Sequence, residues 1–469
     1  MPLLVAGLAL LAASCSSVPL DELTGGRSPA PTTTTAPGAR PGARTPPGPE
    51  TLADLPGLLA VIDRDGLSVM SPAAVPHGHL DDDRVGGQPT WSRDGTRVAA
   101  TFVTPVGIDG DDGDAPHALV LAEAPTAPTD GALDATVVDT ATPWFFATWS
   151  PDACCLAVLG PGDTGTTLGL LDADGRALGP DTALEGRPEW IAWSPDGSRL
   201  AVRSSGELRL VAVDGRVGDP VGGAGPTDPT PLWLDDTHVL GHAPDGTATD
   251  RVRLVSVDVD TGVTSAVGDG LVVATPVAAA LDPTRGLLAL AHPETAGSTR
   301  PIAAPAMTSG AVVEIVDLAT GERDRVADVP VVWLEWSPDG THLLLGVPGP
   351  RGVRWDVVDR GGGRAEGPTL RPSGTEVRDH LPFFEQYAES PRRWSPDSRA
   401  FVVSGRFGSE DGVWVVRLPG SSRLLPTAAS VPVGSVAAVQ DRAPRSSLPD
   451  PVRVGDGRIA FWSPSAPPP

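Results

Sequence analysis

The pentapeptide Trp193-Ser194-Pro195-Asp196-Gly197 decides the fold, because it recurs along the chain. Closely related copies begin at Trp91, Trp149, Trp336 and Trp394, and each is followed by a short polar step and an apolar run. Within the motif, proline presets the backbone for a turn, aspartate can bond its own backbone, and glycine accepts a positive φ. Each copy therefore predicts a strand, a tight turn and a second strand.

Two weaker copies, at Trp233 and Leu281, fill the longest gap, so that seven anchors follow one another at intervals of 40 to 58 residues. This period is typical of four-stranded propeller blades. Residues 58–70 predict two further strands and residues 458–462 at least one, and their pairing would close the ring. The sequence predicts an all-β propeller of seven to eight four-stranded blades, with eight favoured. The expected packing anchors are Trp91, Trp149, Trp193, Trp233, Trp336 and Trp394.

The composition narrows the possible functions. The 469 residues carry a formal charge of −24, which disfavours a nucleic-acid partner. The chain contains no lysine, which excludes a Walker-type phosphate loop and a Schiff-base mechanism. The 55 glycines and 52 prolines indicate many turns and few long helices.

Residues 1–14 are uncharged and end in small residues directly before Cys15. The segment resembles a bacterial lipoprotein signal peptide, and the run from Leu11 to Cys15 is similar to a lipobox. It is too short to span about 30 Å of hydrocarbon as a helix. The resemblance implies that Cys15 becomes the lipidated first residue. We expect a disordered Pro/Thr/Gly-rich tether over residues 15–56, a propeller over 57–464 and a disordered tail over 465–469.

The Trp-Ser-Pro-Asp-Gly units resemble the PD40, or WD40-like, repeats of the TolB family, which also occur in actinobacterial envelope lipoproteins and in the propeller halves of prolyl oligopeptidases. This resemblance implies a TolB-like propeller over about 85% of the chain. A prolyl oligopeptidase also needs a Gly-x-Ser-x-Gly nucleophile elbow. The sequence contains no such pentapeptide.

One segment is rich in groups that could contact a ligand. Residues 382–393 contain the single tyrosine of the chain, Tyr387, together with Glu385 and Arg392. These three side chains are our candidate ligand-binding residues if the segment lines the mouth of the propeller. The alternative is that Phe383 and Phe384 place the segment in a blade core. The sequence identifies no catalytic residue.

His77 and His79, followed by three aspartates at 81–83, form the densest group of potential metal ligands. The alternative is a solvated loop, and we expect neither a bound metal nor another cofactor. Cys154 and Cys155 are adjacent, and neighbouring side chains on a strand face opposite sides. We therefore expect two unbridged thiols.

These observations favour a lipid-anchored propeller outside the cytoplasm, held at the outer face of the cytoplasmic membrane. There it would act as a scaffold that binds a protein or glycan of the cell envelope. The alternative is a propeller hydrolase or lyase acting on extracellular or cell-wall saccharide, which would need two converging carboxylates. The sequence favours a non-enzymatic role and leaves an enzyme open.

Overall fold

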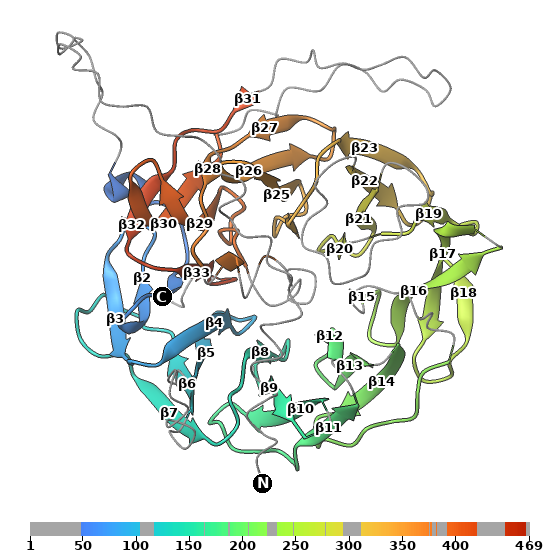
Figure 1. Ribbon diagram of the computed structural model, residues 1–469, viewed down its shortest axis with the longest axis horizontal. Helices are drawn as coiled ribbons and strands as arrows, with labels where there is room; N and C mark the ends of the chain where they lie inside the picture. The colour runs from blue at the N-terminus through green and yellow to red at the C-terminus, as the bar shows by residue number, and fades with distance from the viewer. Residues whose placement is uncertain are drawn as a thin grey trace, which may run out of the picture. The chain divides into compact units, whose positions relative to one another are not determined.

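The computed structural model describes residues 48–103, 117–163, 165–185, 188–204, 206–222, 232–246, 248–276, 278–293, 311–374, 376–377, 381, 392–419 and 446–465. One unit, Pro47–Pro469, contains eight sheets that follow one another around a ring (Figure 1). The predicted all-β propeller is confirmed, with eight blades. The signal segment, Cys15, most of the tether, Glu385, Tyr387 and residues 466–469 lie outside the described residues.

Blades 1 to 4 occupy the first half of the ring, and the strands of each blade are named from the innermost outward. Blade 1 consists of β33 (Ile459–Trp462), β1 (Leu59–Ile62), β2 (Gly66–Met70) and β3 (Pro76–Asp81). Blade 2 consists of β4 (Val85–Trp91), β5 (Arg97–Val103), β6 (His117–Glu123) and β7 (Ala135–Thr140). Blade 3 consists of β8 (Phe146–Trp149), β9 (Cys155–Gly162), β10 (Gly165–Asp172) and β11 (Thr182–Glu185). Blade 4 consists of β12 (Pro188–Trp193), β13 (Arg199–Ser204) and β14 (Glu207–Ala212).

Blades 5 to 8 complete the ring. Blade 5 consists of β15 (Leu232–Trp233), β16 (His238–Asp245), β17 (Ala248–Asp258), β18 (Thr264–Ala266) and β19 (Val272–Ala274). Blade 6 consists of β20 (Ala278–Leu281), β21 (Leu287–Pro293), β22 (Ala311–Asp317) and β23 (Arg323–Ala327). Blade 7 consists of β24 (Trp333–Trp336), β25 (His342–Gly349), β26 (Gly352–Asp359), β27 (Arg364–Glu366), β28 (Thr369–Leu370) and β31 (Ser446–Ser447). Blade 8 consists of β29 (Ala400–Phe407), β30 (Glu410–Arg417) and β32 (Val452–Gly455), with a bridge from Trp394 to Phe401 on its inner side.

The two ends of the propeller meet in blade 1, which confirms the predicted closure. β33 pairs antiparallel with β1, so that Leu59 lies opposite Trp462 and Ile62 opposite Ile459. This pairing covers the inner edge of β1, which would otherwise be open to another chain. The innermost strand of blade 1 ends in Trp462-Ser463-Pro464, an eighth copy of the repeat at a place where we predicted only a strand.

The repeated turn is held by its own side chains. Ser194 Oγ donates to Asp196 Oδ1 at 2.6 Å and accepts from the backbone N–H of Arg199 at 3.2 Å. The same two contacts recur in four more blades, where the fully buried serines are Ser92, Ser150, Ser337 and Ser395. In blade 6 the buried carboxylate of Asp282 takes the place of the serine hydroxyl and accepts from the N–H of Leu287 at 2.8 Å. A local hydrogen-bond pattern therefore ends every one of these inner strands.

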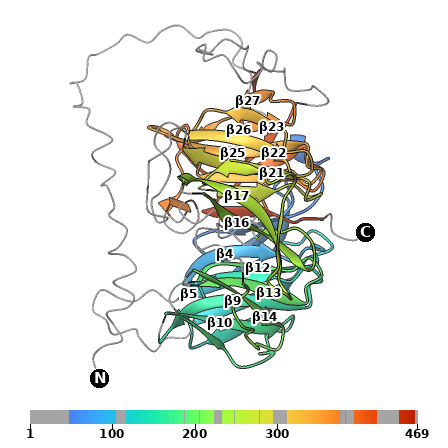
Figure 2. The ribbon, with the colours of Figure 1, turned by 90° about the vertical axis from the view of Figure 1, so that its right-hand side faces the viewer.

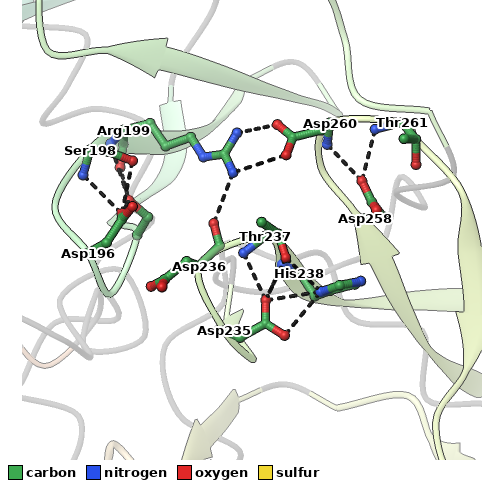
Figure 3. A network of polar contacts seen from close by, with 11 residues as sticks. Asp196, Ser198, Arg199, Asp235, Asp236, Thr237, His238, Asp258, Asp260 and Thr261 are labelled. Carbon is green, nitrogen blue, oxygen red and sulfur yellow. Dashed lines mark hydrogen bonds and ion pairs between the residues drawn. The ribbon is translucent and has the colours of Figure 1, made fainter.

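Neighbouring blades are also joined by hydrogen bonds at the face that carries these turns, which we call the turn face; the opposite face is the loop face. Figure 3 shows one such contact, where Arg199 of blade 4 reaches the carbonyl of Asp236 at 2.9 Å and the carboxylate of Asp260 in blade 5. The other contacts around the ring join Arg97 to Ala173, Thr182 to Gly215, Arg285 to Trp233, Arg360 to Asp282, Asp339 to Ser398 and Ser465 to Asp94. The turn face is thereby tied together from blade to blade.

Blade 8 and blade 1 are bridged at this face by residues that we predicted to belong to the tether. The 3-10 helix η2 (Pro49–Leu52) and the residues after it bury Leu52 and Leu55 against the core of these blades. Asp54 accepts from Arg399 Nη1 at 3.0 Å and from Arg417 Nη1 at 2.8 Å. The folded unit therefore begins before residue 57, because these apolar and charged contacts hold the segment in place.

The Asp54 bridge gives a pH-dependent contribution to stability. The hydrogen bond from Arg417 is the main cause that lowers the Asp54 pKa from 3.8 to about 2. A depressed carboxyl pKa stabilises the fold above the unfolded pKa, and this stabilisation is lost as the pH falls from about 4 to about 2. We expect Asp54→Asn to lower the melting temperature at pH 6 and at low salt, with a difference from the parent that vanishes toward pH 2. Calorimetry of both proteins between pH 2 and pH 7 checks this, and a constant difference over that range would contradict it.

The expectation of two unbridged thiols is wrong, because Cys154 and Cys155 form a disulfide. Only Cys155 belongs to β9, whereas Cys154 lies in the turn before it. The alternation of side chains along a strand therefore does not separate the two sulfur atoms.

The same turn contains a residue that adopts the conformation of a glycine. Ala153 has a φ of +58°, where the equivalent Gly95 and Gly197 each have a φ of +72°. A left-handed conformation costs a non-glycine residue about 1–2 kcal/mol, which exceeds the extra chain entropy of glycine. We expect Ala153→Gly to raise the free energy of unfolding by about 0.5–1 kcal/mol in denaturant titrations.

A matched variant separates this effect from a general benefit of glycine. Ser398 lies at the same turn position with a φ of +60°, but its hydroxyl accepts from the backbone N–H of Asp339 in the neighbouring blade at 3.1 Å. Ser398→Gly should therefore raise the free energy of unfolding little or not at all, because the relief of strain is offset by the lost hydrogen bond. Equal stabilisation by both changes would argue against the backbone explanation.

Candidate functional site

The candidate ligand-binding segment ends at the inner side of blade 8. Of its three predicted residues, only Arg392 is described, and its backbone carbonyl accepts from the N–H of Trp462 at 2.7 Å. The structure therefore brings the end of this segment against the closing strand β33. Glu385 and Tyr387 lie outside the described residues, so the predicted grouping of the three side chains stays a prediction.

The next residue, Arg393, occupies the polar centre of this region with 1% of its surface exposed. Its guanidinium carbon lies 4.2 Å from the ring centre of Trp333 and 4.6 Å from that of Trp355, both in blade 7. The ring of Phe461 on β33 follows at 5.5 Å. Cation–π attraction of this kind is strongest where water is excluded. Three aromatic rings from two blades therefore hold one buried cation.

Two carboxylates complete this group. Arg393 Nη2 donates to Glu376 Oε1 at 2.5 Å, and the backbone N–H of Arg393 donates to Glu335 Oε1 at 3.0 Å. The other oxygen of Glu335 accepts from the indole N–H of Trp333 at 2.8 Å. We call Glu335, Trp333, Trp355, Glu376 and Arg393 the arginine cluster.

Burial governs the charge state of the arginine cluster. Desolvation raises the pKa of Glu376 and of Glu335, although Arg393 opposes the rise in both. Among the described residues, Arg393 Nε and Nη1 and Glu376 Oε2 have no hydrogen-bond partner. A buried cation with unused donors beside an unused acceptor can hold a polar group or accept a proton, and this combination of properties marks functional sites. In the part of the chain that the structure describes, Arg393 and Glu376 form the ion pair with both side chains most deeply buried, each 1% exposed.

The sequence predicted Arg392, which is the neighbour of this site, and did not identify Arg393 at its centre. Glu335 directly precedes the anchor Trp336 and Arg393 directly precedes the anchor Trp394. A charged residue at a position where other repeats place an apolar or small residue, such as Ala192, was the available signal. Nothing in the sequence marked Glu376, which comes from a different part of the chain.

The histidine group on blade 1 forms hydrogen bonds across β2 and β3. His79 Nδ1 lies 2.7 Å from Ser68 Oγ, which also donates to Asp63 Oδ2 at 3.0 Å, and His79 Nε2 lies 3.1 Å from Asp81 Oδ1. His77 is buried, and desolvation lowers its pKa. No group of three or more His, Cys, Asp or Glu side chains among the described residues is arranged to hold a metal ion.

The aspartates of the repeat are occupied in their turns. The hydrogen bond from Ser194 leads the causes that lower the pKa of Asp196. Burial is the largest single influence on the Asp94 pKa and raises it, but hydrogen bonds from Ser92 and Thr96 together lower it below its usual value. These carboxylates are held as anions by the turn itself, so their regular recurrence around the ring reflects turn geometry and not a shared binding site.

The fold and this site define the class of the protein, an eight-bladed β-propeller whose seventh and eighth blades enclose a buried arginine. No family model matches the chain, and no curated protein sequence matches it. Among solved structures, it is similar to TolB from Acinetobacter baumannii, with 15% identity, a TM-score of 0.37, and 61% of this chain and 63% of that one covered. A eukaryotic initiation factor aligns at 11% identity and a TM-score of 0.49 over 87% of this chain and 99% of its own.

A third similar structure is the dihydro-heme d1 dehydrogenase NirN, at 16% identity and a TM-score of 0.48 over 80% of this chain and 73% of its own. All three identities are below the level at which function is shared, so the likeness concerns the fold. The function must be argued from the residues of this chain.

Proposed function

We propose that this protein is a lipid-anchored propeller of the cell envelope that binds a protein or glycan through its loop face. The anchor is Cys15 at the outer face of the cytoplasmic membrane, as the lipobox-like sequence indicates. No described helix is long and apolar enough to cross a membrane. A binding scaffold of this kind needs a rigid body and one face left free for its partner.

The hydrogen bonds that join the blades support this assignment of faces. Side chains of the turn face are occupied by these hydrogen bonds around the ring, and the Asp54 bridge fixes residues 48–56 on that same face. The described part of the chain therefore enters the propeller on the turn face, and the loop face is free of this segment. On the loop face, directly before β8, Phe145 has 47% of its surface exposed. A half-exposed large aromatic side chain is typical of protein-binding surfaces.

Site-specific cross-linking distinguishes the two faces. A photoreactive phenylalanine analogue replaces Phe145 in one variant and Val263 in the other, because Val263 is a 60% exposed apolar residue of the turn between β17 and β18 on the turn face. We expect a discrete cross-linked species in membranes from the first variant only. Equal yields from both positions, or none from position 145, would contradict the assignment of the loop face.

The anchor is tested separately. Cys15→Ala should move the protein from the membrane fraction to the soluble fraction outside the cell, because alanine has no thiol to carry the acyl chains. Recovery of this variant in the membrane fraction would exclude Cys15 as the anchor while leaving the loop-face assignment to be judged by cross-linking.

One observation favours the alternative saccharide hydrolase or lyase. Glu335 and Glu376 both accept hydrogen bonds from Arg393, and burial raises the pKa of both carboxyl groups, which is the direction that a general acid needs. Release of reducing ends from cell-wall saccharide that disappears in Glu335→Gln would establish this activity. Equal release by the parent and the variant would exclude Glu335 from it.

A further inference from the structure

Five of the seven tryptophans that end an inner strand follow one hydrogen-bonding rule between blades, whereas Trp462 donates to the carbonyl of Pro56. The indole N–H of Trp193 donates to the carbonyl of Thr148, the residue directly before the anchor of the preceding blade, at 3.2 Å. Four other anchors obey the same rule, with contacts from Trp91 to Phe461, Trp233 to Ala192, Trp336 to Ala280 and Trp394 to Glu335. Figure 2 shows the sheets of β9 and β10 next to those of β13 and β14, the two blades joined by the Trp193 contact. Five copies of the repeat therefore show which hydrogen bond the indole N–H at this position normally forms.

Trp149, the anchor of blade 3, departs from the rule. The equivalent acceptor would be the carbonyl of Thr90 in blade 2, but the indole N–H of Trp149 has no hydrogen-bond partner among the described residues. The side chain is well buried, since the residue keeps only 6% of its surface exposed. A buried donor without a partner costs about 1–3 kcal/mol, so its presence calls for a physical reason.

The same interface contains a cavity. A hollow of about 170 Å³ between blades 2 and 3 is lined by Trp149 together with Arg97, Glu123, Asp134, Thr136 and Asp174. Arg97 is held across the interface by a hydrogen bond from its Nη1 to the carbonyl of Ala173 at 2.9 Å. Asp174 forms an ion pair with Arg176 at 2.6 Å, whereas Glu123 and Asp134 form none within the described residues. The incomplete tryptophan contact and the hollow thus occur at one and the same interface.

The side chains that line the cavity carry both signs of charge, so they can bind a positive group and a negative group of one ligand. Glu123 and Asp134, two carboxylates without an ion pair among the described residues, attract a cation, and the indole and guanidinium N–H groups require an acceptor. A cavity of this volume admits a molecule the size of a small amino acid. Ordered water is the competing occupant, because a polar hollow of this size can hold several molecules.

We propose that the cavity between blades 2 and 3 binds a small zwitterion of the amino-acid class. Its ammonium group lies between Glu123 and Asp134, and its carboxylate accepts hydrogen bonds from Arg97 and from the indole N–H of Trp149. This site is on the turn face, and it is independent of the partner surface proposed for the loop face.

The experiment uses the folded chain labelled with ¹⁵N at tryptophan, so that each indole N–H gives one NMR signal. L-Serine is the probe, and two matched molecules lack one charged group each, namely ethanolamine without the carboxylate and 3-hydroxypropionate without the ammonium. We expect the Trp149 signal, assigned by its loss in Trp149→Phe, to shift saturably with serine. Either matched molecule should bind at least about tenfold more weakly in the same titration.

Variants of the protein control for structural damage. Trp193→Phe removes an indole N–H that already has a partner, so it should leave the serine titration of Trp149 unchanged. Glu123→Gln keeps the shape of the wall and should weaken serine binding about tenfold, because a charged hydrogen bond becomes a neutral one. Absence of a saturable serine shift in the parent protein, or an equal response to ethanolamine, would overturn the proposal and leave water or a simple cation as the occupant.

Discussion

Removal of β33 should abolish the soluble, monomeric propeller. A chain that ends at Arg458 lacks the inner strand of blade 1, so every ladder contact between β1 and β33 disappears. The carbonyl of Phe461, which accepts from the indole of Trp91 in blade 2, is lost with it. The uncovered edge of β1 would then be free to pair with other chains. Size-exclusion chromatography of the expressed protein should show aggregate in place of monomer.

A graded series at Trp462 tests the same closure without deleting a strand. Trp462 is fully buried, and its indole N–H donates to the carbonyl of Pro56 at 2.8 Å. We expect Trp462→Ala to cost about 3–5 kcal/mol in the free energy of unfolding, as large-to-small changes in cores do. Trp462→Phe keeps most of the ring. In addition to the small loss from its reduced volume, it should lower the free energy of unfolding by about 1 kcal/mol, because the hydrogen bond is lost. A truncated chain that melts like the parent would show that β33 does not close the ring.

Loss of the buried cation of Arg393 should cause the second largest decrease in the free energy of unfolding. Arg393→Met retains an unbranched side chain between the rings of Trp333 and Trp355 but leaves Glu376 buried without its counter-charge. Removing one partner of a buried ion pair typically destabilises a protein by about 3–5 kcal/mol. Denaturant titration of the variant and the parent at pH 7 measures this difference directly.

Two further measurements separate charge from packing at this position. Arg393→Met/Glu376→Gln carries no buried charge at either residue and should recover more than half of the loss. The cost of Arg393→Met alone should be larger at pH 8 than at pH 5. Burial raises the pKa of Glu376, and a carboxyl whose folded pKa is raised destabilises the fold increasingly as the pH rises above the unfolded value. A loss that is independent of pH and unaffected by the second substitution would assign the effect to packing alone.

The blades themselves were predictable because their information is local. In Trp193-Ser194-Pro195-Asp196-Gly197 the turn is specified within five residues, and the hydroxyl-to-carboxylate contact of Ser194 and Asp196 spans two positions. The alternation of apolar residues then identifies the strands on either side. Even the closure followed from the same reasoning, since unpaired strands at both ends of a ring of blades have only each other as partners.

The arginine cluster was not predictable to the same degree. Arg392 and Arg393 are adjacent and chemically identical, and only the packing of blade 7 against blade 8 places Arg393 between two indole rings. Glu376 reaches it from outside the regular strands. Cys154 and Cys155 illustrate the same limit, because their pairing depends on where the turn ends and β9 begins.

The amino-acid order thus established the repeat, a ring of seven or eight blades and the way in which the ring closes, because each rests on turns and alternation within a few residues. The folded molecule was needed to show which charged side chain is buried, which face is tied from blade to blade, and which tryptophan lacks the partner that its equivalents have. Those properties arise where blades meet, between residues 17 to more than 300 positions apart, and their energies depend on desolvation that no short stretch of sequence encodes.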